Sequence, residues 1–168
     1  MSRYTILIVD DEKLILDIIS KASRIDKYRV LTADSAEEGM VLLEMNNIDL
    51  VISDHQMPGM SGIQFLQHVR TTYPDVLTIL LTGYASLETA MEAINSAGVY
   101  KFLTKPFDIN ELLITIKRAF EVKDLVRERN LLMNKVRSYE SRLDELEKEY
   151  PGITHVVRDA NGEIITDI

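Results

Sequence analysis

The 168-residue chain contains no cysteine, so disulfide bonds, zinc-thiolate sites and thiol catalysis are excluded. It has no apolar run that approaches the roughly 20 residues a membrane helix needs, and its N-terminus leads directly into an expected strand without a signal-peptide pattern. The formal net charge of −8 and the lack of a basic stripe argue against direct nucleic-acid binding. We therefore expect a cytoplasmic protein that binds neither membrane nor nucleic acid.

Short apolar runs alternate with helix-like stretches over the first 120 or so residues. The expected strands are residues 4–10, 28–32, 49–53, 76–81 and 99–103, and the expected helices between them are near 13–23, 35–45, 63–70 and 86–94. Strands that alternate with helices favour a parallel sheet with right-handed crossovers and helices on both faces. The predicted fold class is α/β, a flavodoxin-like doubly wound five-stranded parallel sheet in the order 2-1-3-4-5.

Polar residues stand where four of these strands end. Asp10 and Asp11 end the first strand and Asp54 ends the third. Thr82 ends the fourth strand, and Lys105 follows the fifth. Because the carboxyl ends of parallel strands lie along one edge of a sheet, these side chains should meet in a single pocket.

The residue types in this pocket favour phosphoryl chemistry. Three clustered carboxylates repel one another, and a divalent cation would relieve that repulsion. Oxygen ligands without cysteine point to Mg²⁺, which takes one or two protein carboxylates together with waters and a phosphate. A carboxylate beside such an ion can act as a nucleophile and form an acyl phosphate. The ammonium of Lys105 would neutralise charge on the transferring group, and the Thr82 hydroxyl could donate a hydrogen bond to it.

The same motifs resemble the receiver domain of bacterial two-component response regulators. The matching motifs, which are in the order typical of that family, are Asp10-Asp11, Asp54 in Asp-x-x-Met-Pro-Gly-Met-x-Gly, Thr82-Gly83 and Lys105-Pro106-Phe107. The resemblance covers about residues 3–122. It implies a regulatory domain that is not an enzyme, apart from self-catalysed phosphotransfer and autodephosphorylation.

The resemblance also implies the phosphoacceptor and its metal. Asp54 would accept the phosphoryl group from a sensor histidine kinase or a phosphotransfer protein. Asp10 or Asp11, together with Asp54 and the backbone carbonyl of Gln56, would bind Mg²⁺. A haloacid-dehalogenase-type phosphatase shares the Asp nucleophile, but it usually has a second Asp at the position of Gln56. His55, beside the phosphoacceptor, is expected to face solvent from a loop.

The remaining roles implied by the resemblance concern the response to phosphate. Lys105 would pair with the phosphoryl group, and the bond between Lys105 and Pro106 is expected to be cis. Thr82 would move towards the phosphate, and Phe102, three residues before Lys105, would change rotamer. Thr82 and Phe102 are thus the expected switch pair.

The last helix is expected to be unusually long, because no Gly or Pro follows Asp108 until Pro151. From Val122 onward it contains four heptads whose first and fourth positions are mainly apolar. The a positions are Val122, Arg129, Val136, Leu143 and Tyr150, and the d positions are Leu125, Leu132, Tyr139 and Leu146. Partly β-branched a positions with mostly Leu d positions favour a parallel two-stranded coiled coil. A helix that folds back on its own domain is the alternative.

Charges beside the apolar seam agree with parallel pairing. Parallel pairing would place Lys135 against Glu140 of a second copy, and Arg142 against Glu147. Arg129 at an a position would weaken the seam locally and could fix its register. An isolated helix with this seam would be unstable in water, so we expect a parallel homodimer.

Three regions follow from these patterns: a receiver domain at 1–121, a coiled-coil dimerisation helix at 122–150 that continues the last receiver helix, and a β-hairpin at 151–168 around Asn161-Gly162. The expected function is a response regulator that transmits phosphorylation through its dimeric coiled coil to an unknown downstream protein. Two alternatives stay open. One is a dimeric adaptor or scaffold whose partner binding is tuned by phosphorylation. The other is the N-terminal part of a longer regulator with an output domain beyond Ile168.

Overall fold

A computed structural model describes residues 4–25, 28–83 and 97–152 of the chain. The chain divides into two compact units, Met1–Phe120 and Glu121–Ile168. The helix predicted at 86–94 and the hairpin strands predicted within 153–168 lie outside the described residues.

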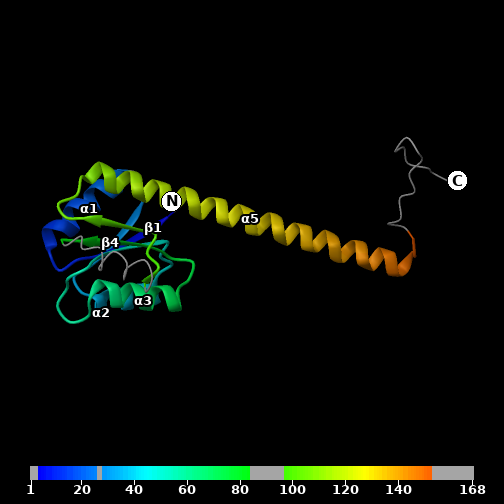
Figure 1. The fold of residues 1–168 in the computed structure, drawn as a ribbon, viewed down its shortest axis with the longest axis horizontal. Coiled ribbons are helices and arrows are strands. Elements are labelled where there is room, and N and C mark those ends of the chain that lie inside the picture. Colours follow the sequence, from blue (N-terminus) through cyan, green and yellow to red (C-terminus); the bar gives the residue numbers. More distant parts are fainter. Residues whose placement is uncertain (1–3, 26–27, 84–96, 153–168) are drawn as a thin grey trace. The chain divides into compact units, whose positions relative to one another are not determined.

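Five parallel strands form one sheet in the order β2-β1-β3-β4-β5 (Figure 1). Their bounds are β1 Thr5–Val9, β2 Arg29–Ala33, β3 Leu50–Asp54, β4 Leu77–Thr82 and β5 Lys101–Thr104. The order and the parallel pairing confirm the predicted fold class. The strands β1 and β3 are buried along their whole length, as expected for a parallel sheet covered on both faces.

Helices α2 (Ala36–Met45) and α3 (Gly62–Thr72) cover one face of the sheet. Helix α1 (Lys13–Ile25) and the first three turns of α5 (Ile109–Glu149) cover the other (Figure 1). Serine residues cap α2 and α3 as N-terminal helix signals predict. The Ser35 hydroxyl accepts a hydrogen bond from the backbone N–H of Glu38, so the start of α2 is confirmed.

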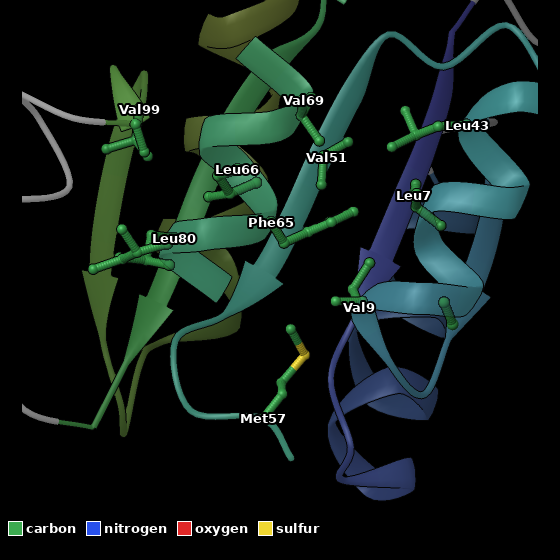
Figure 2. Close-up of a cluster of buried hydrophobic side chains, with 14 of the residues drawn as sticks. Leu7, Val9, Leu43, Val51, Met57, Phe65, Leu66, Val69, Leu80 and Val99 are labelled. Carbon is green, nitrogen blue, oxygen red and sulfur yellow. The ribbon is translucent and has the colours of Figure 1, made fainter. Parts of the chain in front are cut away.

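Successive side chains along each strand point to opposite faces of the sheet, and each face has its own hydrophobic core. Figure 2 shows the face under α2 and α3, where Leu7, Val51 and Leu80 from three strands meet Phe65 and Leu66 of α3. The intervening strand residues, such as Ile8 and Ile52, pack on the opposite face with α1 and α5. The two cores hold the strands in fixed register, so the residues at their carboxyl ends have fixed backbone positions.

Helix α5 is a single helix of 41 residues, which confirms the prediction of a continuous final helix. It starts after Asp108, whose carboxylate accepts a hydrogen bond from the backbone N–H of Asn110 at 2.8 Å. Within the first unit, Ile116 and Phe120 are buried, and the Phe120 ring stacks on Tyr4 with ring centroids 4.2 Å apart. None of the described helices combines the length and the apolar character needed to cross a membrane.

In the second unit, α5 exposes its apolar residues to solvent. The apolar a and d residues from Val122 to Tyr150 are 37% to 65% exposed. The described residues therefore leave this seam uncovered within one chain, and whether a second copy covers it stays a prediction.

Candidate functional site

The backbone pairing of the sheet brings the polar strand ends to one edge. The ladder extends one residue beyond β1 and β5. The Asp10 N–H donates to the carbonyl of Ala33 at 3.2 Å, and the Lys105 N–H donates to the carbonyl of Thr82 at 2.7 Å. Asp54, the last residue of β3, pairs with Leu81 of β4. The predicted meeting of Asp10, Asp54 and Lys105 at this edge is thus present, and the backbone there is held by β-sheet hydrogen bonds.

The ammonium of Lys105 lies between two buried carboxylates. Its Nζ is 2.6 Å from Asp54 Oδ1 and 2.8 Å from Asp10 Oδ2. The side chains of Asp10 and Asp54 are almost completely shielded from water, whereas Lys105 keeps partial access to it. Charge-assisted contacts of this length are strong hydrogen bonds. One cation therefore joins two of the three carboxylates that the sequence placed in the pocket.

Glu12 was not among the predicted site residues, yet its Oε1 lies 3.4 Å from Lys105 Nζ. The acidic run Asp10-Asp11-Glu12 is the sequence signal that could have indicated it. Asp11, which was predicted as an alternative metal ligand, is exposed and does not take part in the ion pairs of Lys105. Of the two neighbouring aspartates, Asp10 is the one that faces Asp54 across the ammonium.

Burial and pairing oppose each other in setting the pKa values of this cluster. Burial raises the pKa of Asp10 above its ordinary value, and the hydrogen bonds from Lys105 and from the Glu12 N–H offset only part of that rise. Burial lowers the pKa of Lys105, but its hydrogen bonds to Asp10 and Asp54 outweigh burial, so the pKa of Lys105 is raised. Lys105 is therefore fully charged at neutral pH, and the ionised form of Asp10 is less favourable than in water.

Backbone N–H groups fix the remaining carboxylate oxygens. The Gln56 N–H donates to Asp54 Oδ2 at 2.7 Å, and the Glu12 N–H donates to Asp10 Oδ1 at 2.8 Å. Both carboxylates are thus held from two sides, by a backbone amide on one oxygen and by Lys105 on the other. The arrangement orients Asp54 without using all the lone pairs of its oxygens.

The loop after β3 passes very close to the phosphoacceptor candidate. The Gly62 N–H donates to the carbonyl of His55 at 2.9 Å, and a Cβ at position 62 would overlap the Asp54 carbonyl oxygen. Gly59 in the same loop has a φ of +79°, a conformation that favours glycine. The Pro-Gly turn of the sequence thus becomes a tight loop that returns the chain to α3. Across the pocket, the peptide bond between Lys105 and Pro106 is cis, as predicted.

The expectation that His55 faces solvent is wrong. Its ring Nδ1 lies 3.2 Å from Thr82 Oγ1, and the side chain is half-buried. The backbone continues the β3–β4 ladder, because the His55 N–H donates to the carbonyl of Leu81 at 2.7 Å. This places the ring beside the end of β4. Phe102, the other expected switch residue, is half-buried and packs against the core under α2 and α3.

The donor set fits a small, hard divalent cation. Within the described ranges no group of three or more His, Cys, Asp or Glu side chains is arranged as a complete metal centre. Mg²⁺ does not require one, since it is usually bound through one or two carboxylates and keeps several waters. Asp10 and Asp54 supply two carboxylates that share one ammonium. These two residues would hold the ion, and the Gln56 carbonyl is a further candidate ligand.

Comparisons with known proteins agree on one family. The family model described as the response regulator receiver domain matches residues 6–117. The hydrogenase transcriptional regulatory protein HoxA of Cupriavidus necator is 34% identical over 121 residues, which are 72% of this chain and 25% of that protein. The chain thus spans about a quarter of the length of the curated relatives it matches, including Regulatory protein AtoC of Escherichia coli, at 33% identity over 73% of this chain and 26% of AtoC.

Solved structures show the same fold. A CheY-like receiver domain protein from Methanospirillum hungatei superposes with a TM-score of 0.70 at 33% identity, over 73% of this chain and 98% of that one. The beryllofluoride-activated NtrC4 receiver domain dimer gives a TM-score of 0.67 at 34% identity, over 71% and 98%.

Proposed function

The chain belongs to the response regulator receiver domain family, and on this premise we propose that Asp54 accepts a phosphoryl group from a histidine kinase or a phosphotransfer protein. The family is regulatory, so this reaction is a signal input. The observation that carries the proposal is the contact of Asp54 Oδ1 with the Lys105 ammonium at 2.6 Å, at the edge of the sheet where Asp10 also lies.

The proposed step is a transfer between a phosphohistidine and a carboxylate. A carboxylate oxygen of Asp54 attacks phosphorus, the phosphorus–nitrogen bond breaks, and the donor imidazole leaves and takes up a proton. The product is an acyl phosphate on Asp54. Lys105 is positioned to move its hydrogen bond from the carboxylate to a phosphoryl oxygen and to neutralise part of the charge there. Mg²⁺ held by Asp10, Asp54 and the Gln56 carbonyl would supply further charge neutralisation.

Labelling with a radioactive phosphodonor tests the acceptor. Asp54→Asn should abolish acid-labile label, because an amide oxygen cannot form the acyl phosphate. Asp17→Asn on the exposed face of α1 is the matched control and should keep the label. Chelation of Mg²⁺ should also remove it. Persistent label on the Asp54→Asn variant would refute the assignment.

The output of the proposed switch is a parallel homodimer through residues 122–150. The apolar seam of α5 is exposed in the single chain, and burial against a second copy would remove that surface from water. In a parallel arrangement, Lys135 and Arg142 would then face the oppositely charged Glu140 and Glu147 of the second copy. A relative, the NtrC4 receiver domain, was solved as a beryllofluoride-activated dimer. Phosphorylation would change how the two receivers pack.

A charge placed in the seam tests the dimer. Leu132→Asp at a d position should dissociate it, as measured by light scattering after size-exclusion chromatography. Asn134→Asp adds the same charge at an outer f position and should leave the dimer intact. Equal dimer populations for these two variants would refute the coiled coil.

Disulfide crosslinking tests the transmission of the signal. The chain has no native cysteine, so single cysteines at Leu125, Leu132 and Leu146 report only on the seam. Beryllofluoride should change their crosslinking rates if phosphorylation alters the coil. Identical patterns would instead favour a fixed dimeric scaffold whose phosphorylation tunes the binding of another protein.

A further inference from the structure

The contact between His55 and Thr82 joins the residue after the phosphoacceptor to the expected switch residue. His55 Nδ1 and Thr82 Oγ1 are 3.2 Å apart. Their side chains come from neighbouring segments, the residue that follows β3 and the last residue of β4. The contact lies beside the ion cluster of Lys105 but includes none of its members.

The backbone around this contact is fixed on both sides. The His55 N–H donates to the carbonyl of Leu81, the Gly62 N–H donates to the carbonyl of His55, and the Thr82 carbonyl accepts from the Lys105 N–H. Thr82 is also 2% exposed, so its hydroxyl has little access to water. Under these conditions the distance between Nδ1 and Oγ1 is set by side-chain rotation, while the backbone stays in place.

From this geometry we infer that His55 is a positioning residue that holds the Thr82 hydroxyl in the unphosphorylated arrangement. The inference rests on the proposed function, in which Thr82 moves towards the phosphoryl group on Asp54. At 3.2 Å the contact is already near the long end for a hydrogen bond. A small rotation of Thr82 therefore breaks this contact, so a hydroxyl that turns towards the phosphoryl group gives up its bond to His55.

The contact then sets how readily the receiver switches. A net hydrogen bond of about 1 kcal/mol corresponds to roughly a fivefold change in an equilibrium constant. Every ligand that needs Thr82 in the inward arrangement binds more weakly by this factor while His55 holds the hydroxyl. Loss of the imidazole should accordingly strengthen binding of the acyl-phosphate mimic.

A double-mutant cycle on the full chain tests this role, with beryllofluoride and Mg²⁺ as the probe and the apparent Kd as the readout. His55→Leu should lower the apparent Kd about fivefold. His55→Asn keeps a hydrogen-bonding atom at the position of Nδ1 and should bind like the wild type. In a Thr82→Ala background, His55→Leu should have no effect, because the hydroxyl it releases is absent. His68→Leu, on the exposed face of α3, is the matched control.

A spectroscopic signature separates positioning from a structural effect. The ¹⁵N resonance of His55 Nδ1 should shift when beryllofluoride is added to the wild type. In Thr82→Ala without beryllofluoride it should already lie near the shifted value. Equal effects of His55→Leu in both backgrounds, a His55→Asn variant that behaves like His55→Leu, or weaker binding by His55→Leu would each overturn the inference. If the wild-type chain takes up acid-labile label but the effects of the His55 and Thr82 substitutions on the apparent Kd simply add, the inference alone is refuted. If the wild-type chain takes up no acid-labile label, the proposed function is refuted and the inference with it.

Discussion

Replacing Gly62 with alanine should disrupt the loop that carries the phosphoacceptor. The added Cβ would overlap the carbonyl oxygen of Asp54 and would lie 2.8 Å from the carbonyl carbon and 3.0 Å from Ser53 Oγ. The overlapping atoms are backbone at the end of β3, which cannot rotate away as a flexible side chain could. The alanine must therefore displace either the start of α3 or the end of β3.

The magnitude follows from which atoms have to move. Overpacking of a core that can adjust its side chains costs about 1–3 kcal/mol, and a clash with backbone should reach the upper end, about 3 kcal/mol. For a domain of this size that corresponds to a fall in Tm of roughly 10 °C. Displacing the Asp54 backbone by about 1 Å should also slow phosphorylation by about 100-fold.

Urea unfolding followed by circular dichroism, at one fixed protein concentration, measures the effect on stability. Gly83→Ala is the matched control, because a Cβ at that exposed position meets no described atom within 4 Å. It should leave the free energy of unfolding unchanged or raise it by about 0.5 kcal/mol, because alanine lowers the conformational entropy of the unfolded chain. A Gly62→Ala variant within about 1 kcal/mol of the wild type would contradict the close approach of Gly62 to Asp54.

Three further substitutions probe the charges and the helix start. Lys105→Met leaves two buried carboxylates without their ammonium and should lower the free energy of unfolding at neutral pH by about 2 kcal/mol or more in EDTA; an unchanged urea midpoint would contradict the ion cluster. Because burial raises the pKa of Asp10, the folded chain binds that proton more tightly than the unfolded chain, and stability is lost as pH rises from 3.8 through the folded pKa. Asp10→Asn should remove this pH dependence and raise the free energy of unfolding at neutral pH without Mg²⁺. A variant less stable than the wild type would show that ionised Asp10 stabilises the fold, contrary to this prediction. Ser61→Ala removes the capping-box bond in which the Ser61 hydroxyl accepts from the Gln64 N–H, and should cost about 1 kcal/mol in the same unfolding assay; a cost below about 0.3 kcal/mol would count against the cap.

The sheet could be predicted because its strands are buried on both faces. The runs Ile6–Val9 and Leu50–Ile52 are continuous and apolar, and each is followed within two residues by a carboxylate. The fifth strand was placed two residues early, at 99–103, whereas β5 is Lys101–Thr104. Val99 is buried like a strand residue, but pairing with β4 begins only at Lys101. Burial is therefore visible in the sequence, and strand register depends on the partner strand.

The candidate site was predictable up to the ends of the strands. Asp10, Asp54 and Lys105 meet as expected because parallel strand ends share one edge. Side chains beyond a strand end no longer follow the period-two alternation, so their directions could not be derived. That is why the exposure of Asp11, the reach of Lys105 to Glu12 and the turn of His55 towards Thr82 emerged only from the structure.

The net negative charge of the cluster around Lys105 both destabilises the fold and suits the proposed binding of a cation. Three carboxylates, those of Asp10, Asp54 and Glu12, share the single ammonium of Lys105. When all are ionised, two negative charges stay uncompensated, which is the charge that one Mg²⁺ would offset. Burial is the main cause of the raised pKa of Asp10, and the negative charge of Asp54 adds to it. An arrangement chosen for stability alone would replace one of the carboxylates by a neutral side chain. Keeping both buried carboxylates beside one ammonium is costly to the fold, and under the proposed function this cost serves the binding of a cation and a phosphoryl group.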